Sequence, residues 1–492
     1  MMFTQFLDKY IDDLIKKQNE SLDDDRKNLF SKKDYYTMLK PVCDVIIASP
    51  ASSMSKWREE LYQKSGIENE IRDFFLQKKI VSGAVMSYGT PKHQETIIVG
   101  NSEEVKLENG CIVPNVNEMQ ADTIFDLASI TKIFTSLCIM NLVEKGFINL
   151  DDEILKYDKR FVNLKGVTIE DLLSFNVPLI TNGRLNEMPY EKAMEAFFNV
   201  SINHASSNLN PYTDLGIMVL KYVIEAVTKE SYYQYLDDTI LKKFAMVDTN
   251  YLIPSYKLNR VASNNFATSV MKDGHIFIDS GVDKGIVHDP KARLLEYNAG
   301  LMGHAGLFTT AFDMTSLMRG IINHEVLSDE FLREFVKNRR GKKYYDENGN
   351  SKYVQYFGYM TYSKHPILKY SEVFHALSGL SFAGAGFTGT QMTVDPLNEL
   401  YFFLGSNRVH NRLISIPSEY KEKIQTIDGV SGIYDDDKRF IVDARDFAYK
   451  RDDVIIHPIM RLLMQYKMLE DVVAYYNMAA LEEETKTVHH IK

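Results

Sequence analysis

Strand-forming segments stand at both ends of the middle part of this chain, with a long helical stretch between them. The strand signals are residues 80–89, 95–100, 356–362, 390–395 and 399–406. Residues 396–398 are predicted to turn the last two segments into a hairpin, and residues 128–340 are predicted to be mostly helical. One sheet must then gather strands from distant parts of the chain. We therefore expect an α/β fold of the α+β type, with an antiparallel sheet flanked by helices and a helical lobe.

Three regions are expected along the 492 residues. Residues 1–65 read as a charged, helical N-terminal extension that contains the only tryptophan, Trp57. Residues 66–415 hold all the strand signals and form the central module. Residues 416–492 are predicted to be a mostly helical C-terminal extension, with an amphipathic helix pair from about residue 455 to residue 481. A chain of this length can bury a large core.

Charge and cysteine content narrow the classes of partner. The net charge of −10, with scattered basic residues, argues against nucleic acid and against anionic membrane surfaces. No apolar run approaches the roughly 18–20 residues of a membrane span, and the N-terminus lacks the pattern of a secretory signal. Cys43, Cys111 and Cys138 are widely spaced, which suits a reducing compartment. We therefore expect a cytoplasmic protein of unassigned oligomeric state, without nucleic-acid or membrane partners.

Ser129 and Lys132 carry the clearest chemical signal, because they precede the apolar segment 133–143. On a helix this spacing places both side chains on one face, about 5–6 Å apart at Cβ. A serine hydroxyl attacks well only when a neighbouring base takes its proton, and N–H groups at a helix start favour developing negative charge. The same pattern recurs, in polar and irregular surroundings, at Ser53–Lys56, Ser269–Lys272 and Ser418–Lys421. We interpret those three as coincidental.

Two further segments could complete an acyl-transfer site. Tyr212, in the segment Asn-Pro-Tyr-Thr-Asp-Leu-Gly (210–216), directly precedes an apolar helix and could exchange a proton with the nucleophile; it could also be a core or capping tyrosine. The segment Ala-Gly-Ala-Gly-Phe-Thr-Gly-Thr (383–390) leads into a strand. A glycine-rich strand lets a substrate approach the backbone, and a backbone N–H there could stabilise an oxyanion.

Four motifs in this order resemble a known family. They are Phe-Asp-Leu-Ala-Ser-Ile-Thr-Lys (125–132), Tyr-Thr-Asp-Leu-Gly (212–216), Gly-His-Ala-Gly-Leu-Phe-Thr-Thr (303–310), and Gly-Phe-Thr-Gly-Thr followed by Ser-Asn-Arg-Val-His (386–410). Over roughly residues 66–415 the chain looks like the β-lactamase-related serine hydrolases, a group that includes class C β-lactamases, D-amino-acid peptidases, penicillin-binding proteins and family VIII-type esterases. Val-His-Asp-Pro-Lys-Ala (287–292) resembles a bacterial subgroup.

The resemblance implies a β-lactamase/transpeptidase-like fold and assigns roles to individual residues. Ser129 would be the nucleophile, and Lys132 and Tyr212 would together act as the general base. The N–H groups of Ser129 and Phe387 would form the oxyanion hole. Neither a metal nor another cofactor is implied. The 12 histidines also lack the spacing of metal ligands, and His304 is expected to support the fold.

Two positions in the expected substrate-binding and oxyanion region depart from the family pattern. Members usually carry Lys or His two positions before Gly386, where this chain has Gly384. The missing cation argues against substrates that need a carboxylate contact. Asp214 stands where asparagine is common. A carboxylate near Lys132 favours the protonated amine and shifts the role of base towards Tyr212.

Our leading hypothesis is a serine hydrolase that forms an acyl-enzyme at Ser129 and acts on small esters or amides. One alternative is a D-amino-acid peptidase or amidase acting on cell-wall-type fragments. The other is a catalytically impaired protein that keeps the fold as a binding or scaffold module.

Overall fold

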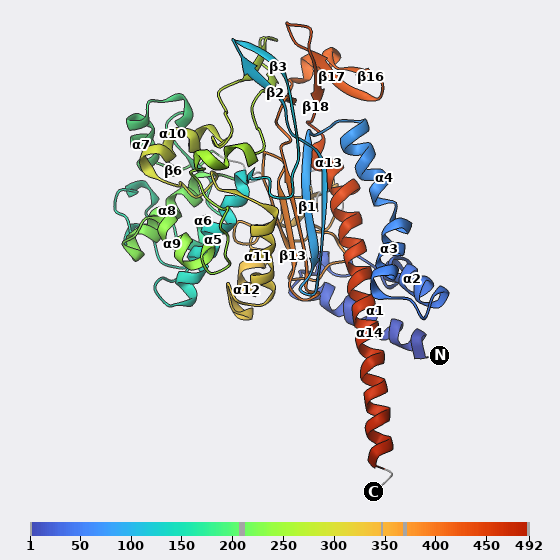
Figure 1. Ribbon diagram of the computed structural model, residues 1–492. Helices are drawn as coiled ribbons and strands as arrows, with labels where there is room; N and C mark the ends of the chain where they lie inside the picture. Colours follow the sequence, from blue (N-terminus) through green and yellow to red (C-terminus); the bar gives the residue numbers. More distant parts are fainter. Residues whose placement is uncertain (1, 206–211, 346–347, 368–370, 490–492) are drawn as a thin grey trace.

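A six-stranded sheet lies at the centre of the computed structural model, which describes residues 2–205, 212–345, 348–367 and 371–489 (Figure 1). The strand order is β12-β13-β14-β1-β2-β3, and every neighbouring pair is antiparallel. The strands are β1 Gly83–Thr90, β2 His93–Glu108, β3 Cys111–Glu118, β12 Phe382–Ala385, β13 Gln391–Asp395 and β14 Leu400–Ser406. Helices cover both faces. The α+β fold expected from the sequence is thereby confirmed.

Strands β1 and β14 join the two ends of the module in the middle of this sheet. Met86 pairs with Leu404, and Val85 pairs with Gly405. A Cβ atom at Gly405 would lie 2.4 Å from the ring of Phe125. Phe125 belongs to β4 (Phe125–Asp126), which pairs with β9 (Phe308–Thr309). The glycine therefore lets the segment that leads to Ser129 pack directly on the sheet.

One face of the sheet is covered by helices from both ends of the chain. The helices are α1 Met2–Asn19, α2 Lys32–Ala48, α3 Met54–Ser65, α4 Ile67–Arg72, α13 Phe447–Arg451 and α14 His457–His489. Leu39 and Leu463 from these helices share one apolar cluster with Met86 and Leu404 of the sheet. The helices expected within residues 1–65 are present, and they pack on the module. The boundaries of the three regions stay a prediction.

The other face carries the helical lobe. Its helices are α5 Thr131–Glu144, α6 Ile169–Leu173, α7 Tyr190–Phe198, α8 Leu215–Thr228, α9 Tyr232–Leu236, α10 Pro290–Ala299, α11 Ala311–Ile322 and α12 Asp329–Val336. Helix α5 is apolar on all sides and packs against α8 and α9 inside the lobe. Helix α11 packs on β1, β13 and β14. Between them these helices place the start of α5 next to the sheet.

A second sheet differs from the sequence expectation, which gave residues 128–340 and 416–492 as mostly helical. Its order is β16-β17-β18-β15-β7-β8. The strands are β7 Ala267–Val270, β8 Ile276–Asp279, β15 Arg412–Ser415, β16 Gln425–Ile427, β17 Val430–Tyr434 and β18 Phe440–Asp443. Each has only three to five residues, too few for a clear alternation of apolar and polar side chains.

Two further expectations were wrong. Residues 356–362 form no strand: Met360 has a φ of +60°, and Phe357 bridges Tyr362 across a turn. In place of the expected C-terminal helix pair there is the single helix α14, whose C-terminal part extends away from the body (Figure 1). Its only proline, Pro458, closely follows the π-helical turn Asp452–Ile456, and residues 447–489 are helical without a break.

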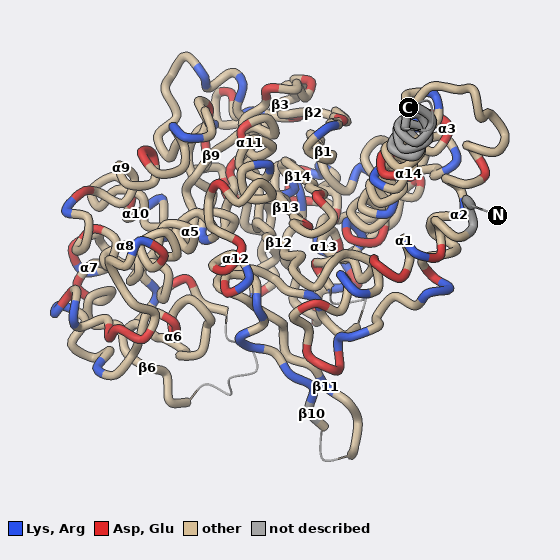
Figure 2. The backbone as a smooth tube through the Cα atoms, turned by 90° about the horizontal axis from the view of Figure 1, so that it is seen from below, with Lys and Arg blue, Asp and Glu red and all other residues tan. Residues whose placement is uncertain are grey.

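Short two-stranded pairs lie outside the two six-stranded sheets. The short strands β5 (Leu179–Ile180) and β6 (Ser201–Ile202) pair with each other, as do β10 (Lys343–Tyr345) and β11 (Ser351–Tyr353). Basic and acidic residues are interspersed along the backbone tube over the described residues (Figure 2). Across the same residues, every helix is too short or too polar to cross a bilayer.

Candidate active site

A strained turn presents Ser129 at the start of α5. The turn is a 3-10 segment, Ala128–Ile130, and Ala128 has a φ of +45°, which a non-glycine residue rarely adopts. Asp126 holds this conformation, because its Oδ1 accepts the N–H of Ala128 at 2.8 Å while its Oδ2 accepts the N–H of His288 at 2.8 Å. Burial raises the pKa of Asp126 to about 6, although both hydrogen bonds oppose the shift. Ser129 is partly exposed between buried neighbours.

Lys132 lies buried beneath Ser129 and donates to three acceptors. Its Nζ is 2.8 Å from Ser129 Oγ, 2.9 Å from the carbonyl oxygen of His304 and 2.8 Å from Asp214 Oδ1. An ammonium group has three N–H bonds, so this geometry satisfies all of them. The structure therefore brings Ser129, Lys132 and Asp214 into contact, and their roles stay a prediction. It also shows what the Gly-His-Ala-Gly motif contributes, namely a backbone acceptor for Lys132.

Tyr212 lies beside this group. Residues 206–211 are outside the described part of the chain, so Asn210 and Pro211 of its motif are not placed. The Tyr212 ring stacks on Phe175 with centroids 5.1 Å apart, and Lys132 Nζ is 5.0 Å from the Tyr212 ring centre. This position is compatible with proton exchange near Ser129, and the role stays a prediction.

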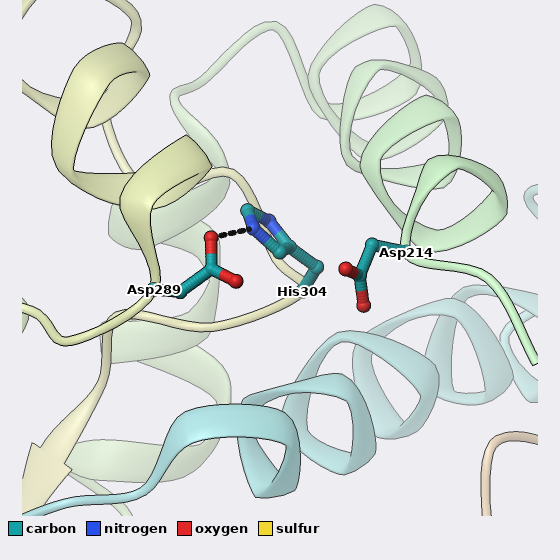
Figure 3. A group of neighbouring side chains, drawn as sticks. All are labelled: Asp214, Asp289 and His304. Atoms are coloured by element: carbon teal, nitrogen blue, oxygen red, sulfur yellow. Dashed lines mark hydrogen bonds and ion pairs between the residues drawn. The ribbon is translucent and has the colours of Figure 1, made fainter. Parts of the chain in front are cut away.

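A chain of charged side chains continues from Asp214 to α10 and its preceding loop (Figure 3). Lys291 Nζ lies 3.0 Å from Asp214 Oδ2 and 3.1 Å from Asp289 Oδ2. His304 Nε2 lies 3.0 Å from Asp289 Oδ1. Asp289 also caps α10 by accepting the N–H groups of Lys291 and Ala292. Sequence reasoning assigned no role to Asp289 or Lys291. The available signal was Asp-Pro, which is typical of a helix start.

Opposite charges stabilise the ionised forms of this network. Burial lowers the pKa of Lys132, but Asp214 and Tyr212 outweigh burial and hold it above its ordinary value. For Asp214, burial raises the pKa, whereas Lys132, His304 and Lys291 bring it well below the ordinary range. For Asp289, burial likewise raises the pKa, but its pairing with His304 and Lys291 outweighs burial, so the pKa of Asp289 is lowered. Lys132 is therefore predominantly an ammonium at neutral pH.

Asp214, Asp289 and His304 also form a possible metal-ligand group, since their ligand atoms lie within 4.8 Å of one another (Figure 3). The donors suit a divalent cation in type. However, Lys132 and Lys291 already neutralise both carboxylates. A cation here would face two ammonium groups at close range, which is unfavourable. The charges of the network are balanced by the chain itself.

The glycine-rich segment is fastened to the turn that carries Ser129. Thr388 Oγ1 donates to the carbonyl of Asp126 at 2.7 Å, and Thr390 Oγ1 donates to the carbonyl of Leu127 at 3.1 Å. Gly386 donates its N–H to the carbonyl of Thr390 at 2.8 Å. A Cβ atom at Gly386 would lie 2.5 Å from the Leu127 oxygen. Phe387, the predicted oxyanion donor, is thus held next to the nucleophile turn.

The ring of Phe387 is half exposed and contacts two cationic or ionisable side chains. It stacks on His288 at a centroid distance of 5.6 Å and lies 5.1 Å from the Arg408 guanidinium carbon. Arg408 also donates to the Phe387 carbonyl at 2.9 Å. Burial lowers the pKa of Arg408 to about 10, which leaves it charged at neutral pH. Sequence reasoning quoted Arg408 in a motif without giving it a role.

The place of the missing basic residue at position 384 is filled by an apolar side chain. A Cβ atom at Gly384 would lie 2.3 Å from Cδ1 of Ile133 and 3.4 Å from Cγ of Met392. A lysine or histidine would have to displace Ile133, which is buried in the first turn of α5. Ile133 thus explains physically why a glycine fits here.

The three remaining Ser-x-x-Lys patterns have structural explanations. Ser269 lies in β7, and Ser418 begins a 3-10 segment. Ser53 differs from the expected irregular surroundings, because it caps α3 and accepts the N–H of Lys56 at 3.4 Å. A capping serine is common at a helix start and needs no catalytic explanation.

Comparison with known proteins places the chain in a family. The family model described as Beta-lactamase matches residues 96–415, which is about two thirds of the chain. A relative in Escherichia coli (strain K12), named "Putative D-alanyl-D-alanine carboxypeptidase", is 25% identical over 322 residues, or 59% of this chain and 70% of the relative. A relative of the same name in Salmonella typhimurium is 23% identical over 339 residues, 62% of this chain and 74% of the relative.

Solved structures show the same fold at low sequence identity. EstCE1, described as a hydrolase with promiscuous acyltransferase activity, matches with a TM-score of 0.55 and 14% identity over 81% of this chain and 99% of its own. An octameric penicillin-binding protein homologue from Pyrococcus abyssi matches with a TM-score of 0.50 and 18% identity over 69% of this chain and 72% of its own. With the family match, these findings show that the chain belongs to the β-lactamase family of serine hydrolases.

Proposed function

We propose that this protein is a serine hydrolase that forms an acyl-enzyme at Ser129 and acts on small esters or amides. The observation that carries the proposal is the distance of 2.8 Å between Lys132 Nζ and the partly exposed Ser129 Oγ. A nucleophile in contact with a buried amine, on a strained turn at a helix start, matches the requirements of acyl transfer. The three free cysteines, Cys43, Cys111 and Cys138, support a reducing, cytoplasmic setting.

The proposed reaction begins when Ser129 Oγ attacks the substrate carbonyl carbon. Lys132 would first give up a proton to solvent, and the minor neutral form would then accept the serine proton while its two N–H bonds stay on the His304 carbonyl and Asp214. Tyr212 is the alternative acceptor. The N–H groups of Ser129 and Phe387 would stabilise the oxyanion. The C–O or C–N bond then breaks, and the leaving group takes the proton. Water attacks the acyl-enzyme in the second half and regenerates Ser129.

The surroundings of Ser129 favour an apolar acyl group without an essential carboxylate. Gly384 and Ile133 leave no cation at the position where the family usually has one. Tyr212 and Phe387 each expose at least a third of their surface beside the site, and such aromatic surfaces bind apolar groups.

A D-amino-acid peptidase is a second candidate function, favoured by the names of the two relatives described above. Its substrate carries a terminal carboxylate, for which Arg408, with its guanidinium carbon 5.1 Å from the centre of the Phe387 ring, is a candidate cation. A panel of short-chain nitrophenyl esters and D-alanyl-D-alanine peptides separates the two functions. Peptide hydrolysis that exceeds ester hydrolysis would replace the first substrate class by the second.

The experiment is labelling with a fluorophosphonate followed by peptide mapping. We expect a single adduct at Ser129, and we expect Ser129→Ala to abolish both the adduct and ester hydrolysis. Ser418→Ala is the matched control, because Ser418 is exposed and carries the same pattern. An adduct at another serine would refute the assignment. If no adduct forms while a substrate analogue still binds, the protein is a binding module.

A further inference from the structure

Lys291 stands out because it contacts the site through Asp214 and lies outside the predicted catalytic set. It is the second residue of α10, and the N-cap Asp289 and Pro290 fix the direction of this helix start. Asp214 uses Oδ1 for Lys132 and Oδ2 for Lys291. Each oxygen of this carboxylate therefore pairs with its own cation, and Lys132 shares the negative charge of Asp214 with Lys291.

The groups that face this pair come from several elements. Helix α5 supplies Lys132, the segment before α8 supplies Tyr212 and Asp214, and the loop before β9 supplies His304. The start of α10 supplies Asp289 and Lys291, and the titratable groups near it are Asp126, Arg293 and Glu296. Two carboxylates and two ammonium groups form the contacts, so their charges cancel.

We propose that Lys291 is a positioning residue that pairs with one oxygen of the Asp214 carboxylate and thereby sets the pH at which Lys132 gives up its proton. The inference rests on the proposed function and extends it. Without Lys291, the full charge of Asp214 would act on Lys132 and hold its proton more tightly. Without Asp214, Lys132 would keep burial and the nearby Lys291 charge, both of which favour the neutral amine. The two changes must therefore move the pH dependence in opposite directions.

The test is the pH profile of kcat/KM for a short-chain nitrophenyl ester, which reports ionisations of the free enzyme. We expect Lys291→Met to move the midpoint of the acidic limb upward by about one pH unit, or about a tenfold loss of kcat/KM below the midpoint. Asp214→Asn should move the midpoint downward. Lys291→Arg keeps the cation and should restore a profile close to that of the unchanged protein.

A matched control is Lys242→Met. Lys242 also bridges two carboxylates, those of Asp237 and Asp238, but on the exposed surface. We expect this variant to keep the unchanged profile. If Lys291→Met leaves the midpoint unchanged, or if Lys291→Arg fails to restore it, the inference is overturned.

A second measurement separates this failure from a failure of the proposed function. The titration of Lys132 can be followed by NMR of protein labelled with 13C-lysine, with the signal assigned through Lys132→Arg. The inference requires that Lys291→Met raises this titration midpoint even if ester turnover proves independent of Ser129. An unchanged midpoint would overturn the inference. Loss of Ser129-dependent turnover with a shifted midpoint would overturn only the proposed function.

Discussion

Replacing Gly386 by alanine tests whether the glycine-rich segment positions the oxyanion donor. The added Cβ would lie 2.1 Å from Thr390 Oγ1 and 2.5 Å from the Leu127 carbonyl oxygen. Contacts below about 3 Å cannot persist, so the segment must move away from the Ser129 turn. Such overpacking costs about 1–3 kcal/mol, and each lost hydrogen bond adds about 1 kcal/mol. The bonds at risk are Gly386 to Thr390 at 2.8 Å and Thr390 to Leu127 at 3.1 Å.

We expect Gly386→Ala to lower the free energy of unfolding, but to reduce the catalytic rate far more than it reduces stability. Displacing an oxyanion donor costs about 10²–10³-fold in rate, so we expect kcat/KM for a nitrophenyl ester to fall by about two orders of magnitude. The assay pairs this measurement with thermal unfolding followed by circular dichroism.

Gly281→Ala is the matched control for this prediction. Its Cβ would meet Asp279 only at 3.6 Å and Arg293 only at 3.8 Å, which are ordinary contacts. We expect the unchanged activity from this variant. Full activity of Gly386→Ala would refute the reasoning. So would restoration of Gly386→Ala by Thr390→Ala, since the Leu127 carbonyl would still block the methyl group.

Two further predictions concern stability and substrate choice. Burial holds the pKa of five histidines at about 3 to 4 in the folded protein. Between that range and pH 6.5 these histidines bind protons only after unfolding. Their contribution to the free energy of unfolding is therefore present above pH 6.5 and is lost as the pH falls towards 4. The histidines are His288, His365, His375, His410 and His457. We expect the unfolding temperature to decline steadily from pH 6.5 to pH 4.5, and a flat profile would contradict this. Gly384→Lys should destabilise the protein because Ile133 fills the space that the lysine side chain needs. The double variant Gly384→Lys with Ile133→Ala should recover stability and raise the hydrolysis of D-alanyl-D-alanine peptides relative to esters. Equal stability of the single and double variants would contradict the steric explanation.

The sequence predicts those parts of the fold and site that local patterns control. The hairpin of β13 and β14, the strand β1 and the apolar helices α5 and α8 all follow from periodicity and turn residues. Ser129 and Lys132 lie three positions apart, so helix geometry alone brings their side chains together.

What the sequence could not predict depends on distant contacts or on very short elements. The strands of the second sheet pair β15 with β7 and β18, which are far apart in the chain. The contact of Lys291 with Asp214 likewise joins two helix starts on different elements. Spacing within one segment carries no information about either contact. The long, uninterrupted α14 was missed because a helix pair and one helix share the same periodicity.

The two departures from the family pattern have one electrostatic meaning in the structure. Asparagine at position 214 would be neutral, so no second cation would be needed to weaken its effect on the Lys132 proton. With Asp214, a single cation at 2.8 Å would bind its proton strongly and work against its use as a base. Lys291 offsets that effect from α10, at 3.0 Å from the other oxygen. Position 384 on β12 carries no positive charge, and Lys291 places one beside Asp214. We therefore infer that the departures retune the site rather than disable it.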